Sequence, residues 1–362
     1  MTPRVTVAMI TYNHGPLARE AAQSILAQTF TDFELVIVDD GSTDDTAVAL
    51  KSLDDDRIRY IWQHNRGPSE ARNTALRAAR GQIIAQMSGD DIAEPRRLEM
   101  QVLAHAENPN DVIFCNCTLI DWMGRPVVDR PSPWARTTLT TREGFLNCLY
   151  LRGNCFAAPT ALAAKDVFDK AGEYKAHLLQ TQDWDMWIRC LLMGHGAQIV
   201  PQPLLRYRIS ESNLSASRPE SRVRTQMEVL HVLREYLSIA TVEEAIAILP
   251  EIRHLPYPMD REWLPFLIAM VGLEHGSALT RYFAGTALLD WMSDQSRRSV
   301  TESALGFHAP DLFERLGSLD PYGAESLRKE IQDLSASRTW LIATRLRDVA
   351  RFFLPEKPTN AD

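Results

Sequence analysis

The chain has 362 residues, of which 45% are hydrophobic and 24% are charged, a composition typical of a globular protein with one large domain and a smaller one. Its formal net charge of −8 argues against nucleic acid as a partner, because binding to phosphate backbones requires a basic face. The five cysteines form no CxxC pair, so free thiols in a reducing compartment are expected. Without a signal peptide or an apolar run of roughly 18 residues, the expected location is the cytoplasm.

The first 110 residues alternate between apolar runs, typical of buried strands, and segments with helical spacing. Strands are predicted at 4–10, 33–39, 57–62 and 82–87, and helices at 17–28, 45–53 and 69–79. The turns between them are short, which predicts a parallel, doubly wound α/β sheet covered on both faces. Neither GxGxxG nor a GxxxxGKS/T loop occurs, and this disfavours a dinucleotide-dependent dehydrogenase and a P-loop enzyme.

Two adjacent carboxylates, Asp90 and Asp91, directly follow the fourth predicted strand. Open α/β sheets bind ligands outside the carboxyl ends of their strands, and paired carboxylates there repel each other unless a cation is present. Mg²⁺ or Mn²⁺ in phosphate-handling sites uses one or two carboxylates and leaves positions open for phosphate oxygens. The alternative is a solvated Asp-Asp turn before the next helix. The pair alone favours this alternative, but its sequence neighbours favour the metal site.

After residue 110 the pattern is less regular. It predicts a strand at 111–120, a hairpin around Gly124, a helix at 142–150, a small-residue loop near a site at 153–160, and two short strands within 197–209. Asp183 stands at the start of a further helix. By spacing alone, a capping role for Asp183 at the start of that helix is favoured over a catalytic role.

From about residue 215 the sequence becomes helical. Helices are predicted at 222–237, 242–248, 262–272, 278–292 and 323–353, and the segment 338–355 reads as a basic amphipathic helix. Such a helix can bind a membrane surface, but in an acidic chain packing on its own domain or on a twin subunit is favoured. Homodimerisation, acceptor binding and peripheral membrane contact stay open as roles for this region.

Five motifs, in the same order along the chain, resemble those of the family 2 glycosyltransferases. These enzymes have the GT-A fold and invert the configuration at the anomeric carbon of the sugar. The five motifs are VAMITYNHG (7–15), FELVIVDDGSTDDT (33–46), NRG with ARN (65–73), SGDDIAEPRRLE (88–99) and QDWDMWIR (182–189). Each is moderately specific, but the ordered set is highly specific. The resemblance implies a GT-A domain at 1–214, with a nucleotide-binding half at about 1–110 and an acceptor half at about 111–214. Its mostly parallel sheet is followed by a helical extension at 215–362.

The resemblance also implies a role for each matching residue. The nucleotide sugar, of UDP or dTDP type, would be held by Thr11, Tyr12, Asn13, Asp40, Arg72 and Asp90. Asp91 and Asp90 would hold Mg²⁺ or Mn²⁺, and Asp183 would be the catalytic base. Trp184 and Asn154 are candidates for binding a glycan, lipid-linked or other hydroxyl acceptor, because indole faces stack well on sugar rings. Such enzymes would serve bacterial surface glycan or polysaccharide synthesis.

Three positions depart from the family pattern. The family often has Asp at Ser88, Glu at Gln182 and His near Ser210. These differences leave a degenerate, non-catalytic nucleotide-sugar-binding protein as an alternative. A nucleotidyltransferase is a more distant alternative, because its first loop is expected to be rich in Gly and to contain Arg or Lys, and TYNHG has no Lys.

Overall fold

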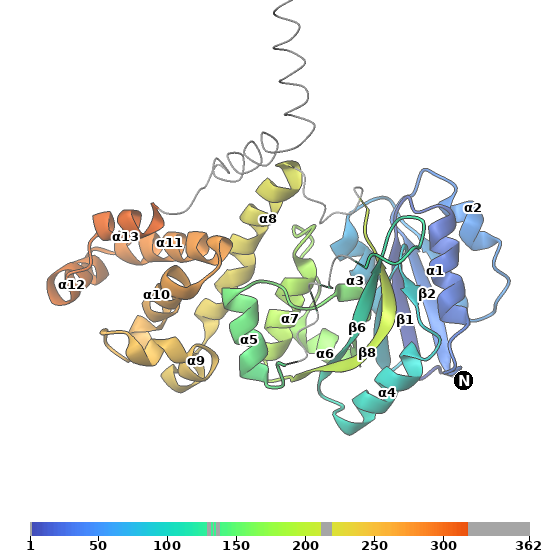
Figure 1. The fold of residues 1–362 in the computed structure, drawn as a ribbon, viewed down its shortest axis with the longest axis horizontal. Coiled ribbons are helices and arrows are strands. Elements are labelled where there is room, and N and C mark those ends of the chain that lie inside the picture. The colour runs from blue at the N-terminus through green and yellow to red at the C-terminus, as the bar shows by residue number, and fades with distance from the viewer. Residues whose placement is uncertain (1, 129–131, 133, 135–137, 211–218, 318–362) are drawn as a thin grey trace, which may run out of the picture. The chain divides into compact units, whose positions relative to one another are not determined.

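The computed structural model describes residues 2–128, 132, 134, 138–210 and 219–317 (Figure 1). The chain divides into two compact units, Met1–Phe307 and His308–Asp362. The described part of the second unit contains helix α13 (Ala309–Leu316). The sheet, the cleft and the other labelled helices all belong to the first unit.

An eight-stranded sheet in the order β3-β2-β1-β4-β7-β6-β8-β5 forms the centre of the first unit. The strands are β1 (Val5–Thr11), β2 (Phe33–Asp39), β3 (Ile58–Trp62), β4 (Ile83–Ser88), β5 (Ile92–Ala93), β6 (Val112–Ile120), β7 (Leu162–Ala164) and β8 (Ala197–Arg208). The pairs β3–β2, β2–β1, β1–β4 and β6–β8 are parallel, as expected. The pairs β4–β7, β7–β6 and β8–β5 are antiparallel, so the sheet is more mixed than the strand–helix alternation suggested.

Helices cover both faces of this sheet, as the uninterrupted apolar strands require. They include α1 (Pro16–Leu26), α2 (Thr46–Lys51), α3 (Pro68–Ala78) and α4 (Arg97–Glu107). Helices α1 and α4 pack on the face that carries Val5, Val7 and Met9, while α3 packs on the opposite face of β1 and β2. Figure 1 shows α1 on one side of the sheet and α5–α7 on the other.

Two Gly-Pro pairs start α1, which follows the turn after β1, and α3, which carries Arg72. Gly15 and Gly67 have φ values of 49° and 86°, which an L side chain rarely adopts. Pro16 and Pro68 follow as the first helical residues, where the missing N–H costs nothing and the ring presets φ. Each strand therefore turns sharply into its helix at the edge of the sheet where ligands are expected.

The second half of the sheet is built from longer-range pairings. Its helices are α5 (Arg142–Leu151), α6 (Lys165–Ala171) and α7 (Gln182–Leu192). The segment predicted as two short strands is the single strand β8, whose register against β6 shifts around Asn116. Pro201 and Pro203 lie at this shift; they lack the N–H that a regular ladder uses, and the side chain of Asn116 donates to the carbonyl of Pro201 instead.

The helical region that was expected after residue 215 is present as far as the structure describes it. It contains α8 (Pro219–Val232), α9 (Val242–Ile248), α10 (Leu264–His275), α11 (Ala278–Ser293) and α12 (Gln295–Leu305). Two buried tyrosines join this region to α5: the hydroxyl of Tyr236 donates to the carbonyl of Leu146, and that of Tyr150 to the carbonyl of Ile268. The helix expected at 323–353 and the basic segment 338–355 lie outside the described residues. No helix in the described ranges is both long and apolar enough to cross a membrane.

Candidate active site

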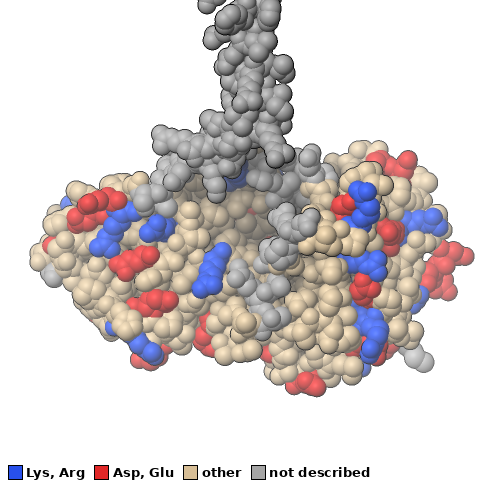
Figure 2. Space-filling model, in the orientation of Figure 1, with Lys and Arg blue, Asp and Glu red and all other residues tan. Residues whose placement is uncertain are grey.

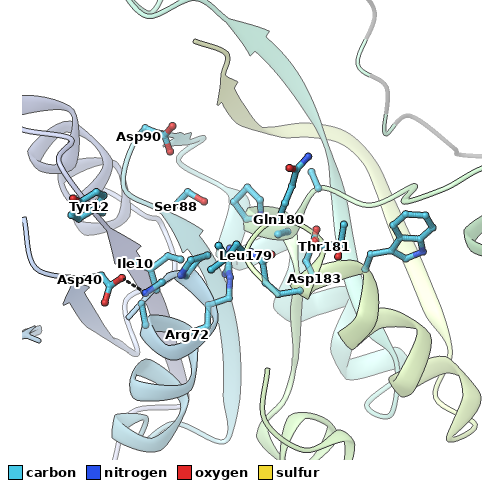
Figure 3. A pocket seen from close by; sticks show the side chains of 18 of the residues that line it. Ile10, Tyr12, Asp40, Arg72, Ser88, Asp90, Leu179, Gln180, Thr181 and Asp183 are labelled. Carbon is cyan, nitrogen blue, oxygen red and sulfur yellow. Dashed lines mark hydrogen bonds between the residues drawn. The ribbon is translucent and has the colours of Figure 1, made fainter. Parts of the chain in front are cut away.

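A cleft of about 660 Å³ lies at the carboxyl ends of β1, β2 and β4. Figure 3 shows Tyr12, Asp40 and Asp90 on one side, Asp183 on the other, and Arg72 between them. On the face drawn in Figure 2, the Lys and Arg side chains of the described residues are interspersed with Asp and Glu. Surface charge therefore does not single out a docking area on this face, and the functional interpretation rests on the cleft.

The turn after β1 contributes Thr11, Tyr12 and His14 to the cleft. Tyr12 is 44% exposed, so its ring is available to a ligand. His14 was not predicted; its Nδ1 lies 3.2 Å from Oγ1 of Thr11. This turn therefore brings a hydroxyl, a phenol ring and an imidazole to one rim of the cleft.

Asn13, in contrast, supports the cleft from behind. It adopts a φ of 53°, a conformation that Asn tolerates better than most residues. Its Oδ1 accepts the N–H of Thr43, and its own N–H donates to Oγ of Ser42. Asn13 is absent from the cleft lining; its hydrogen bonds instead join the turn after β1 to the turn after β2.

Asp40 lines the cleft, but most of its acceptor capacity is already used. Its carboxylate accepts hydrogen bonds from the side chain of Gln63 and from the N–H groups of Arg66 and Gly67. A carboxylate offers about four acceptor positions, so about one remains for a ligand. Asp40 thus shapes the 63–67 loop and presents a single free acceptor position to the cleft.

Gly89 allows the carboxylate turn to approach the turn after β1. A Cβ at this position would lie 2.4 Å from Oγ1 of Thr11 and 2.9 Å from Nδ1 of His14. Because any larger residue would push the two turns apart, Gly89 is what brings Asp90 to the rim of the cleft.

The two adjacent carboxylates have different surroundings. Asp91 is 1% exposed; its Oδ1 accepts the N–H of Arg208, and Oδ2 is buried without a hydrogen-bond partner among the described residues. Burial and the neighbouring Asp90 raise the pKa of Asp91 well above its usual range. The side chain of Asp90, in contrast, lines the cleft. The structure therefore presents Asp90 to a ligand and turns Asp91 inward.

Asp90 and Asp91 fit a divalent cation only if the phosphates of a bound substrate supply further ligands to it. Within the described ranges, no group of three or more His, Cys, Asp or Glu side chains could hold a metal ion by itself. Mg²⁺, however, is commonly bound through one or two carboxylates together with substrate phosphates and water. Asp90 offers such a carboxylate. Its backbone carbonyl accepts a hydrogen bond from Arg208, but its two carboxylate oxygens form no hydrogen bond or ion pair with described residues.

Arg72 lies on the floor of the cleft, on α3. It is 4% exposed, and its Nη1 donates to Oε1 of Gln86 at 2.6 Å. Its Nε is buried without a partner in the described part of the chain. A buried guanidinium with an unused donor is a suitable partner for an anionic group, because charged donors are costly to leave unpaired.

Asp183 faces the cleft from the first turn of α7. The N-cap position belongs to Thr181, whose side chain makes no capping bond, so Asp183 is a first-turn residue. Oδ2 of Asp183 accepts a hydrogen bond of 2.8 Å from Nδ2 of Asn154. Burial raises the pKa of Asp183, while Arg72, the N–H of Trp184 and the amide of Asn154 oppose the rise; the net pKa is above the usual value.

Aromatic side chains also line the cleft. Trp184 lines it as expected, and Trp134 and Tyr207, which were not predicted, form a tilted pair with ring centroids 4.5 Å apart. Trp187 packs in the core against Phe114, as its helical spacing favoured. The loop residues Leu179, Gln180 and Thr181, and Thr225 of α8, also line the cleft; none has a sequence signal that would have identified it.

Comparison with known proteins identifies the family. The model of glycosyl transferase family 2 matches residues 6–166. An uncharacterized glycosyltransferase of Methanocaldococcus jannaschii is 30% identical over 224 residues, which make up 60% of this chain and 74% of that protein. The chain belongs to glycosyltransferase family 2. A second relative, an uncharacterized glycosyltransferase of Rickettsia prowazekii, is 28% identical over 192 residues, and the match covers 52% of this chain but only 58% of that protein.

Solved structures show that this family 2 glycosyltransferase has the expected fold. The crystal structure of residues 1–349 of S. aureus TarS in complex with UDP-GlcNAc has a TM-score of 0.60. The comparison covers 90% of this chain and 92% of that one, at 18% identity. The GT-A fold predicted from the sequence is thereby confirmed.

Proposed function

We propose that this glycosyltransferase moves a sugar from a nucleoside diphosphate sugar to an acceptor hydroxyl in one inverting step, with Asp183 as the base. The observation that carries the proposal is the position of Asp183, which lies across the cleft from the donor-side residues Tyr12, Asp40 and Asp90 (Figure 3). A base on one wall and a nucleotide site on the other is the arrangement that a direct displacement requires.

The donor would occupy the first-half wall. Tyr12 offers a ring face to the nucleobase, Asp40 a remaining acceptor position, and Arg72 an unused donor for the diphosphate. A UDP-type donor is supported by the TarS complex, whose ligand is UDP-GlcNAc. Asp90 would hold Mg²⁺ or Mn²⁺ together with the diphosphate. When bound, such an ion neutralises the charge that develops on the leaving group.

The proposed reaction uses Asp183 on the opposite side of the cleft. The acceptor hydroxyl gives its proton to a carboxylate oxygen of Asp183 as its oxygen forms a bond to the anomeric carbon. The bond between that carbon and the diphosphate breaks on the far side, and the diphosphate leaves with the electron pair. Asn154 and Arg72 help to keep Asp183 ionised before the reaction, because both lower its pKa against the effect of burial.

Trp184, Trp134 and Tyr207 would bind the acceptor, because aromatic faces stack on sugar rings. A glycan or lipid-linked acceptor and a role in bacterial surface glycan or polysaccharide synthesis belong to this proposal. The cytoplasmic location, and dimer or membrane contact through the C-terminal helices, stay predictions.

Calorimetric titration with UDP, dTDP, GDP and CDP, each with and without Mn²⁺, tests the donor side first. We expect one nucleotide, UDP or dTDP, to bind tightly only in the presence of the metal. Nucleotide binding that is equally tight with and without Mn²⁺ would contradict the role of Asp90 as a metal ligand. Absence of all binding would contradict the proposal.

Turnover separates an enzyme from a degenerate binding protein. The protein is incubated with a panel of UDP-sugars, and release of UDP is followed. An enzyme hydrolyses its donor slowly even without the acceptor, since water reaches the position of the acceptor hydroxyl. Tight UDP binding with no release of UDP from any donor of the panel would favour the binding protein.

A further inference from the structure

We infer that Glu228, on α8, is a positioning residue: it fixes the loop in front of Asp183 and thereby sets the geometry of transfer, without taking part in nucleotide binding. This inference rests on the proposed function. Glu228 lies beyond the residues matched by the family model, which ends at residue 166.

The carboxylate of Glu228 receives four hydrogen bonds from three successive residues. Oε1 accepts the N–H of Leu179 at 2.9 Å. Oε2 accepts the N–H groups of Gln180 and Thr181, each at 2.9 Å, and the hydroxyl of Thr181 at 3.0 Å. The side chain of Glu228 is 6% exposed, and no cation forms an ion pair with it among the described residues. Within the described ranges, the hydrogen bonds of this carboxylate therefore all come from the loop 179–181.

The loop that Glu228 holds is part of the cleft wall. Leu179, Gln180 and Thr181 all line the cleft, and Thr181 is the N-cap of α7. Asp183 follows two residues later, so a shift of Thr181 moves the start of α7 and the proposed base with it. A misplacement of about 1 Å can cost on the order of 10²-fold in rate.

The part of the loop before Leu179 is fixed by other contacts. Oγ of Ser69, on α3, donates to the carbonyl of Leu178 at 2.6 Å, and Asn73 binds the backbone of Tyr174 through two hydrogen bonds. These anchors do not involve Glu228. Loss of the Glu228 carboxylate is therefore expected to release residues 179–183, while the donor wall and residues 174–178 keep their positions.

The variant Glu228→Gln tests this directly. Glutamine keeps the shape of the side chain but turns one acceptor oxygen into an N–H₂ donor, which then faces at least one backbone N–H. The control is Glu235→Gln. Glu235 lies in the short 3₁₀ helix Leu233–Ser238 that follows α8, and it is not part of the cleft lining. It pairs with Nζ of Lys175 at 2.6 Å, and Lys175 also pairs with Asp185, a contact that the control variant leaves in place.

Three measurements are made on the full-length wild type and both variants. In Glu228→Gln we expect UDP affinity with Mn²⁺, measured by calorimetry, to stay within about twofold, while kcat for UDP-sugar turnover falls on the order of 10- to 100-fold. Amide hydrogen exchange is expected to accelerate at residues 179–183 but not at 174–178. Glu235→Gln is expected to match the wild type in all three measurements.

The outcomes separate the inference from the proposed function. Unchanged turnover in Glu228→Gln, or equal losses of UDP affinity and turnover, would overturn the positioning role, and so would unchanged exchange at 179–183. If the wild type itself turns over no UDP-sugar, the proposed function fails. Hydrogen exchange then still decides whether Glu228 holds the loop.

Discussion

The side-chain amide of Asn154 donates a hydrogen bond of 2.8 Å to Oδ2 of Asp183. The two residues come from separate elements, the loop after α5 and the first turn of α7. A hydrogen bond to a carboxylate favours its charged form. Because burial favours the neutral form of Asp183, Asn154 helps to keep this carboxylate able to accept a proton.

Replacement of Asp183 by Asn is expected to lower transfer by about 10²- to 10⁴-fold, the usual contribution of a positioned base. UDP binding in the presence of Mn²⁺ should persist, because the donor-side residues are untouched. UDP release from the donor and calorimetric UDP binding measure the two quantities separately. Transfer close to the wild-type rate would show that another group takes the proton.

The same variant is expected to be more stable than the wild type at neutral pH. The pKa of Asp183 is higher in the folded protein than its usual value. The stabilisation from its neutral form is therefore complete below the unfolded pKa and is lost as pH rises through the folded pKa. Thermal melting at pH 7 should give a higher Tm for Asp183→Asn, and the difference should shrink in acid. A lower Tm at pH 7 would contradict the direction of this pKa shift.

Removal of the Asn154 amide is expected to move the acid limb of the activity profile. Asn154→Ala raises the pKa of Asp183 further, because a hydrogen bond that lowers it is lost. The ionised base then disappears at a higher pH, so the acid limb of kcat shifts upward. The matched control is Asn147→Ala, whose amide binds the carbonyl of Ile248 at 3.0 Å, away from the cleft. If the acid limb of the kcat profile stays at the same pH in Asn154→Ala, Asp183 is not the group whose titration produces that limb.

The variants Asp90→Asn and Asp91→Asn should differ in their response to metal. Asp90→Asn is expected to bind UDP equally with and without Mn²⁺, because the carboxylate facing the cleft is lost. Asp91→Asn keeps an acceptor oxygen for the N–H of Arg208 and should retain the response to metal. Calorimetric titration of both variants with UDP decides this. The reverse pattern would make Asp91 the metal ligand and require its side chain to turn toward the cleft.

The parts of the fold that the sequence predicted are those with local signals. Apolar runs and Gly-Pro turns identified β1 to β4 and the helices between them, often to within one or two residues. The antiparallel strands β5 and β7 have only two and three residues, which is too short for a periodic pattern. Their pairing depends on contacts between distant segments, for which the sequence carries no local signal.

The site was predictable to a similar extent. Thr11, Tyr12, Asp40, Arg72, Asp90, Asn154, Asp183 and Trp184 all line the cleft, whereas Asn13 and Asp91 do not. Both exceptions are sequence neighbours of cleft residues within turns, where a motif does not tell which side chain points inward. Trp134, Tyr207 and Thr225 reach the cleft only through the tertiary fold, so no spacing rule could have identified them.

The residues that line the cleft fall on both sides of the point where the family match ends. Thr11, Asp40, Arg72 and Asp90, and also Trp134 and Asn154, lie within the matched segment 6–166, whereas Leu179–Trp184, Tyr207 and Thr225 follow it. Sequence changes after residue 166 can therefore alter the surroundings of Asp183 while the turns that carry Tyr12, Asp40 and Asp90 keep their sequence.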